Sequence, residues 1–287
     1  MRVFCHTSLY PFIDFVLTSK EKQFKLHHQL HSKCILLTDS PKEVVQKLST
    51  AKMILLDPDL FDAWTDIVLF LQEKTSLPIK LFVIADSDIS LCNDHMDALF
   101  AYFPDTEFWI QNWLGGHEQC QLLPIGASRP FDVFSAPKSR PLLCSFAKGY
   151  ESSVKRSEYL KWLDTFPEKK TYSQPPLDFS DYLQTVAEAK YHTCPMGMGY
   201  DTFRFWESLA LGAIPIVKEH FFYERLKAFF PDAPTVYVSS WEEVPERLFS
   251  FPEVSFPSLP YLFEDYWVTK CQTLLEGNVK ISKSTAC

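Results

Sequence analysis

The side chains best suited to chemistry lie between Lys190 and Lys218, in the sequence KYHTCPMGMGYDTFRFWESLALGAIPIVK. Three of the eight glycines of the chain fall in this stretch, which also contains Arg204 and, three positions later, Glu207. A glycine loop offers backbone N–H groups without an obstructing Cβ, and a guanidinium offers a fixed fork of donors to phosphate oxygens. A carboxylate one turn further on can accept hydrogen bonds from ribose hydroxyls. The stretch therefore predicts a site for a phosphate-bearing ligand.

The same stretch predicts the elements that position these groups. A loop with two glycines leads into a helix with one apolar face, and Gly212 marks the helix end. The residues 213–217 then predict a short buried strand. Loop, helix and strand in this order form an α/β unit whose helix N-terminus can face an anion. The alternative is an ordinary crossover in which Arg204 and Glu207 pair with each other at the surface.

Two segments of this stretch resemble the donor-site signature of exostosin-like glycosyltransferases. They are residues 201–207, DTFRFWE, and residues 211–217, LGAIPIV. The resemblance is good over about thirty residues and loose over the C-terminal half, and it is barely detectable before Pro124. It implies the GT-B fold, in which two Rossmann-like domains with parallel sheets face each other across a cleft.

The resemblance also implies roles for individual residues in binding a nucleotide-sugar. Arg204 would contact the diphosphate and Glu207 the ribose. The remaining loop residues that would surround the donor are Gly197, Gly199, Asp201 and Thr202.

A second group of phosphate contacts is expected near the start of the second domain. Residues 140–146 predict its first strand, and a glycine-bearing loop and a helix from about Ser153 follow. In GT-B enzymes such a loop often meets the donor phosphates, so the resemblance implies donor contacts for Lys148, Gly149 and Arg156. The alternative for the two basic residues is a surface charge.

The N-terminal half alternates predicted strands with predicted helices, which indicates a parallel sheet covered on both faces. The expected strands are residues 2–7, 34–39, 53–57, 80–86 and 108–112. Ligands of open α/β sheets bind beyond the carboxyl ends of the strands. The polar residues expected there are His6, Asp57, Asp59, Asp86, Asp88 and Asn112.

One of these residues is a candidate general base that deprotonates an acceptor hydroxyl. We expect this role first for Asp86 and Asp88. The alternative is that they form turns or cap helices, as aspartates at strand ends often do.

These patterns predict three parts of the chain. Residues 1–137 would form an acceptor-side Rossmann-like domain, and residues 138–260 a nucleotide-sugar-binding Rossmann-like domain. Residues 261–287 would form a helix that packs back on the first domain, followed by a tail.

Composition limits the partners. The net charge of −8 argues against nucleic acid and anionic membranes, both of which attract clustered lysines and arginines. The eight cysteines form no CxxC pair, and the N-terminus shows no signal-peptide pattern. No apolar run is long enough to span a membrane. We therefore expect a soluble cytoplasmic protein with reduced cysteines.

The function predicted from these observations is inverting, metal-independent transfer of a sugar from a nucleotide-diphosphate sugar to a saccharide or glycan hydroxyl. No cofactor is expected. Alternatives are a GT-B module that binds without turnover, and a metal-dependent GT-A transferase using Asp57-Pro58-Asp59 or Asp86-Ser87-Asp88. A nucleotide-sugar epimerase or a hydrolase is a third class. His27 and His31 also have the spacing of metal ligands on a helix, but no acidic partner follows them, so we expect a solvated helix face there.

Overall fold

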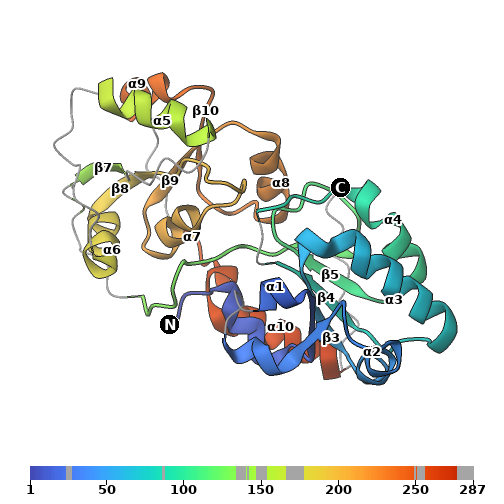
Figure 1. The fold of residues 1–287 in the computed structure, drawn as a ribbon. Helices are drawn as coiled ribbons and strands as arrows, with labels where there is room; N and C mark the ends of the chain where they lie inside the picture. The colour runs from blue at the N-terminus through green and yellow to red at the C-terminus, as the bar shows by residue number, and fades with distance from the viewer. Residues whose placement is uncertain are drawn as a thin grey trace.

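A computed structural model of the chain describes residues 1–23, 28–85, 88–133, 140, 142–146, 154–165, 178–248, 250 and 256–276. It contains a six-stranded and a four-stranded sheet, and every strand pair in both is parallel. The predicted α/β architecture with two parallel sheets is therefore confirmed, and it is consistent with a GT-B-like fold. We call residues 1–133 with the last helix the N-terminal lobe, and residues 140–250 the C-terminal lobe (Figure 1).

The sheet of the N-terminal lobe has the order β2-β1-β3-β4-β5-β6. Its strands are β1 (Phe15–Thr18), β2 (Cys34–Leu36), β3 (Met53–Leu56), β4 (Leu81–Ile84), β5 (Glu107–Ile110) and β6 (Cys120–Leu122). Besides the last helix, the α-helices of this lobe are α1 (Lys20–Gln23), α2 (Pro41–Leu48), α3 (Phe61–Thr75) and α4 (Asn93–Tyr102), with 3-10 turns at His6–Phe12, His28–Lys33 and Pro58–Leu60. Helix α2 begins at Pro41, and Ser40 and Glu43 form a capping box around this first turn.

Helix α10 (Glu264–Glu276) lies against the N-terminal sheet, on the face opposite α4. Successive residues of β5 point to opposite faces of the sheet. Phe108 packs edge-on against Phe100 of α4, with the ring centroids 5.4 Å apart. Trp109 packs edge-on against Trp267 of α10, also with the ring centroids 5.4 Å apart. Both faces of this sheet are therefore covered, as the continuous apolar runs of its strands require.

The sheet of the C-terminal lobe has the order β10-β9-β8-β7. Its strands are β7 (Leu142–Phe146), β8 (Ala189–Thr193), β9 (Ile214–Lys218) and β10 (Val236–Val238). Its helices are α5 (Val154–Thr165), α6 (Phe179–Glu188), α7 (Phe203–Ala210), α8 (Phe221–Phe229) and α9 (Val244–Arg247), with 3-10 turns at Trp241–Glu243 and, after this lobe, Pro260–Leu262. Helices α5 and α9 cover one face of the sheet, and α6 and α7 the other (Figure 1).

Helix α7 ends where the sequence predicts. Gly212 adopts a φ of 73°, its N–H donates to the Leu209 carbonyl, and the N–H of Ala213 donates to the Ser208 carbonyl. This pair of bonds is a Schellman motif, which needs a residue in the left-handed region and therefore favours glycine. The chain is thereby turned directly into β9.

Two local predictions were wrong. Residues 2–7 form no strand of the sheet, because Arg2, Val3 and Cys5 make isolated antiparallel bridges to Asp132, Phe263 and Gly126, and β1 begins only at Phe15. Residues 190–193, at the start of the stretch that was expected to open with the glycine loop, belong to β8 instead. Helix α4 and strand β6 were not predicted. The expected domain boundary near residues 136–139 lies outside the described residues.

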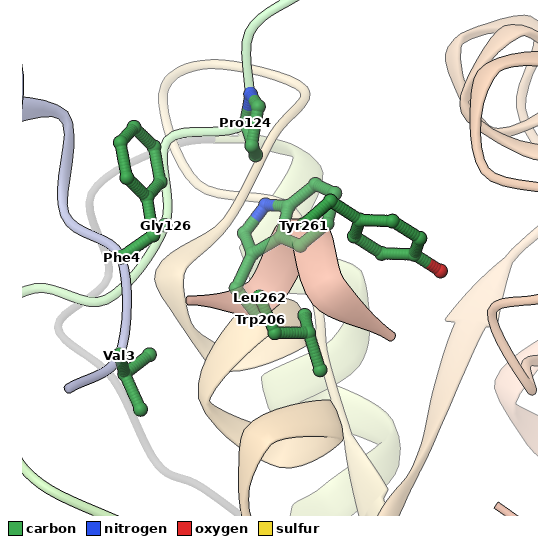
Figure 2. Close-up of a pocket in the computed structure, with 7 residues that line it drawn as sticks. All are labelled: Val3, Phe4, Pro124, Gly126, Trp206, Tyr261 and Leu262. Carbon is green, nitrogen blue, oxygen red and sulfur yellow. The ribbon is translucent and has the colours of Figure 1, made fainter. Parts of the chain in front are cut away.

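The two lobes share buried apolar surface. One continuous cluster contains the core of the N-terminal lobe together with Phe205 and Trp206 of α7 and Phe222 and Leu226 of α8. A small apolar pocket opens beside this junction, and Figure 2 shows Trp206 among its lining residues, which are Val3, Phe4, Pro124, Gly126, Tyr261 and Leu262. Its lining carries no charged side chain, so this pocket is unsuited to a diphosphate.

Candidate functional site

The loop between β8 and α7, residues 194–202, leaves the C-terminal sheet at the carboxyl end of an interior strand. We call it the glycine loop. Strand β8 lies between β7 and β9, with Thr193 paired with Phe146 on one side and with Ile216 on the other. Loops at this edge of a parallel sheet are where α/β proteins bind ligands. The sheet therefore places Gly197, Gly199 and the start of α7 where the sequence predicted a site.

Two arginines come together beside this loop, Arg156 from α5 and Arg204 from α7; we call them the arginine pair. Arg156 is 8% exposed, and burial, with the neighbouring charge of Arg204, lowers its pKa from 12.5 to about 10. Arg204 is half-buried, and no residue in the described part of the chain forms a hydrogen bond or ion pair with its guanidinium. An anion bound beside Arg204 would favour the charged form of both arginines.

The absence of a side chain at Gly197 makes room for Arg156. A Cβ placed on Gly197 would lie 3.1 Å from Nη2 of Arg156. The glycine loop therefore packs closely against one of the two guanidinium groups. Glycine suits position 197, because the side chain of any larger residue would be in close contact with Arg156.

His192 on β8 lies close to the arginine pair and was not predicted from the sequence. It is 1% exposed, and its Nδ1 is 2.6 Å from the Ser145 hydroxyl on the neighbouring strand. Burial, together with the positive charge of Arg204, lowers its pKa to about 3, so the ring is neutral at pH 7. Its Nε2 has no hydrogen-bond partner within the described ranges. The prediction missed it because residues 190–193 were assigned to the loop.

Glu207 forms hydrogen bonds with protein groups on both carboxylate oxygens. Its Oε1 accepts from the Ser128 N–H at 2.9 Å and the Ser128 hydroxyl at 2.7 Å, and its Oε2 accepts from the Tyr182 hydroxyl at 2.9 Å. The side chain is 2% exposed. Burial and the charge of Glu207 raise the pKa of Tyr182. The ribose contact stays a prediction, and a ribose hydroxyl would have to join or replace these donors.

Asp201 fastens the end of the glycine loop. Its carboxylate accepts hydrogen bonds from the N–H groups of Ile125 and Thr202 and from Nε1 of Trp206, each at 2.8 Å. Burial raises the pKa of Asp201 to about 7, although these three donors act in the opposite direction. Thr202 is the N-cap residue of α7, and its side chain makes no capping hydrogen bond. Asp201 therefore joins the loop, the helix and the segment that leaves β6.

The N-terminal lobe also contacts the glycine loop. Asp88, a predicted base, accepts a hydrogen bond from the N–H of Gly199 at 2.9 Å. Asn112 accepts from the N–H groups of Tyr200 and Asp201 at 3.1 and 2.8 Å. The amides of residues 199–202 are thus already paired with side chains. A phosphate at this site would meet the guanidinium groups rather than these four amides.

The other predicted residues are placed as follows. Asp57 caps the short helix Pro58–Leu60 by accepting a hydrogen bond from the N–H of Asp59. Asp86, Lys148, Gly149 and His27 lie outside the described residues. Within the described ranges no group of three or more His, Cys, Asp or Glu side chains is arranged to hold a metal ion.

The described cysteines and helices can be compared with the composition-based expectations. All seven cysteines within the described ranges are free, and six of them are buried. No helix in the described part of the chain has both the length and the apolar character needed to cross a bilayer.

A comparison with protein-family models gave a match that covers the C-terminal lobe. Residues 133–256 match a protein-family model described as the RXYLT1 C-terminal domain, which is ribitol xylosyltransferase-like. The matched residues include the arginine pair, the glycine loop and Glu207. A search of curated proteins gave no match to the chain. The protein is therefore glycosyltransferase-related through its C-terminal lobe.

Proposed function

We propose that the protein transfers a sugar from a nucleotide-diphosphate sugar to a hydroxyl of a saccharide or glycan acceptor, with inversion and without a metal ion. The observation that carries this proposal is the arginine pair. The two arginines follow neighbouring strands at the carboxyl end of the second parallel sheet and interact electrostatically, and the described residues leave the half-buried Arg204 without a hydrogen-bond or ion-pair partner. A pyrophosphate would supply negative charge to Arg204 and accept bidentate hydrogen bonds from its guanidinium fork.

The charge of the arginine pair suits the leaving group of this reaction. The acceptor oxygen forms a bond to the anomeric carbon while the bond from that carbon to the diphosphate oxygen breaks. The nucleoside diphosphate leaves with the bonding electron pair, and the acceptor proton passes to a carboxylate base. Fixed cations stabilise the negative charge that grows on the diphosphate in the transition state. Lys148 and Gly149 are proposed as further contacts to the same phosphates.

The remaining assignments rest on the sequence and on the family match. Glu207 is proposed to contact the ribose, and the base is proposed to be one of the aspartates after β4, Asp86 or Asp88. Since the matched family is ribitol xylosyltransferase-like, we propose a pentose as the transferred sugar. A hexose donor is the second choice.

A thermal-shift series tests donor binding. UDP-, GDP- and dTDP-sugars share a diphosphate, whereas CMP-sugars carry one phosphate. A ligand at a hundred times its Kd stabilises the folded state by about 2.7 kcal/mol. We expect at least one diphosphate donor to raise the melting temperature and CMP-sugars to have no effect. A series without any shift would refute donor binding at this site.

Product analysis then tests turnover. The protein is incubated with the donor that binds, in the presence and absence of saccharide acceptors, and the nucleotide and sugar products are identified. Transfer with inverted anomeric configuration supports the proposal. Donor breakdown or epimerisation without an acceptor would indicate the hydrolase or epimerase class, and tight binding without any reaction would indicate a binding module.

A further inference from the structure

Three consecutive N–H groups of the glycine loop are held by two side chains of the other lobe. The N–H of Gly199 donates to Oδ1 of Asp88, and the N–H groups of Tyr200 and Asp201 both donate to Oδ1 of Asn112. Asp88 follows β4 and Asn112 follows β5, so both extend from the carboxyl edge of the N-terminal sheet. The contact joins residues about ninety to a hundred and ten positions apart in the chain.

The local geometry is specialised for this contact. Asn112 has a φ of 52°, in the left-handed region that asparagine tolerates better than most residues. A Cβ on Gly199 would lie 2.9 Å from Oδ1 of Asp88 and 3.1 Å from Nδ2 of Asn112. A larger residue at position 199 would therefore displace both side chains. The loop has a glycine where the opposite lobe approaches its backbone.

The same loop contacts Arg156 at its other glycine. Gly197 packs against Arg156, whereas Gly199, two residues later, is bonded to Asp88. Asp201 completes the attachment by accepting from the N–H of Ile125 in the segment after β6. The loop is therefore fixed by the N-terminal lobe along its second half while its first half borders Arg156.

We propose that Asp88 and Asn112 are positioning residues that hold the glycine loop in the shape that packs against Arg156. In this role Asp88 acts as a hydrogen-bond acceptor to a backbone amide, and its negative charge is not required. Asp88 then contributes to donor binding through the loop, and of the two aspartates proposed above as the base this inference leaves Asp86. The part of this inference that concerns donor binding rests on the function proposed above, whereas the part that concerns the loop does not.

Hydrogen exchange of the individual loop amides tests the loop contact directly, without any ligand. Asp88→Ala removes the acceptor from an exposed residue, and Asp88→Asn keeps an acceptor oxygen while removing the charge. We expect the Gly199 amide to exchange at least tenfold faster in Asp88→Ala and at the wild-type rate in Asp88→Asn. Asp94→Ala, which changes an exposed aspartate on α4, serves as the matched control and should have no effect.

Asn112 provides the second variant. Asn112→Asp keeps the oxygen that accepts from the Tyr200 and Asp201 amides, whereas Asn112→Ala removes it. We expect both amides to exchange faster in the alanine variant only. Unchanged exchange of all three amides in both alanine variants would overturn the proposal, as would an Asp88→Asn variant that exchanges like Asp88→Ala.

Titration with inorganic pyrophosphate then separates the two proposals. We expect Asp88→Ala to raise the Kd for pyrophosphate several-fold and Asp88→Asn to restore the wild-type Kd. Faster exchange with an unchanged Kd would overturn the link between the loop and the arginine pair. If the wild type itself does not bind pyrophosphate or nucleotide-sugars, the proposed function fails, and the exchange results still decide whether Asp88 and Asn112 hold the loop.

Discussion

Replacing Arg204 with alanine should affect binding and stability in opposite directions. Arg204 is half-buried, its guanidinium forms no hydrogen bond or ion pair within the described ranges, and its charge adds to burial in lowering the pKa of Arg156. Its removal therefore costs the folded protein no contact of its side-chain head group, and it relieves repulsion between like charges. We expect an unfolding free energy equal to or above that of the wild type.

The loss of binding follows from the hydrogen bonds that a guanidinium makes to a phosphate. A hydrogen bond to a charged group contributes about 1.5–3 kcal/mol, and a bidentate contact contains two. Arg204→Ala should therefore weaken pyrophosphate and nucleoside-diphosphate binding by at least about 3 kcal/mol, which is more than a hundredfold in Kd.

Arg140→Ala is the matched control. Arg140 donates to the carbonyls of Ala189 and Leu211 at 2.7 and 2.8 Å, and so ties the start of β8 to the end of α7. Its loss should lower the unfolding free energy by about 2 kcal/mol, because two carbonyls lose a charged donor. The affinity of the remaining folded protein for pyrophosphate should not change.

Calorimetric titration with pyrophosphate and urea unfolding provide the two measurements for each variant. The expected result is a crossed pattern, in which Arg204→Ala loses affinity and Arg140→Ala loses stability. An Arg204→Ala variant that binds pyrophosphate like the wild type would place the phosphates elsewhere and refute the reasoning. So would a loss of stability in that variant equal to the loss in Arg140→Ala.

Two further predictions concern the buried groups of the site. Glu207→Gln should weaken nucleoside-diphosphate binding by about 1–3 kcal/mol and leave pyrophosphate binding unchanged, because only the former has a ribose. Equal losses for both ligands, measured by calorimetry, would contradict the ribose contact. The unfolding free energy should fall by up to about 4 kcal/mol as the pH drops from 6.5 to 3. The reason is that His192 is protonated below about pH 6.5 in the unfolded chain, whereas burial keeps it neutral down to about pH 3 in the folded protein. His192→Asn should lack this part of the acid destabilisation in urea titrations between pH 4 and 7, and an unchanged pH profile would show that His192 is not its source.

Much of the site region could be predicted from local pattern. The glycine loop, the helix with Arg204, its end at Gly212 and the buried strand after it are all set by short-range rules of backbone conformation and apolar spacing. The alternation of strands and helices likewise predicted two parallel sheets. Residues 190–193 were misplaced because a five-residue strand directly after a helix has no turn residue to mark its start.

The partners of the polar groups could not be predicted. Glu207 and Arg204 were expected to share a ligand or a surface ion pair, yet Glu207 bonds to Ser128 and Tyr182. These residues lie 79 and 25 positions away in the sequence. Whether such distant residues come into contact is decided by how the chain segments pack. Asp88 likewise pairs with an amide 111 positions away.

By itself the sequence determined which residue types are present and the order of the elements that carry them. The tertiary structure alone decided that Arg156 meets Arg204 and that Asp88 and Asn112 reach the glycine loop. The physical reason is that secondary structure follows from interactions within a few residues, whereas electrostatic and hydrogen-bond partners depend on distances between distant segments. Those distances are fixed only when the two sheets and the buried surface between the lobes have formed.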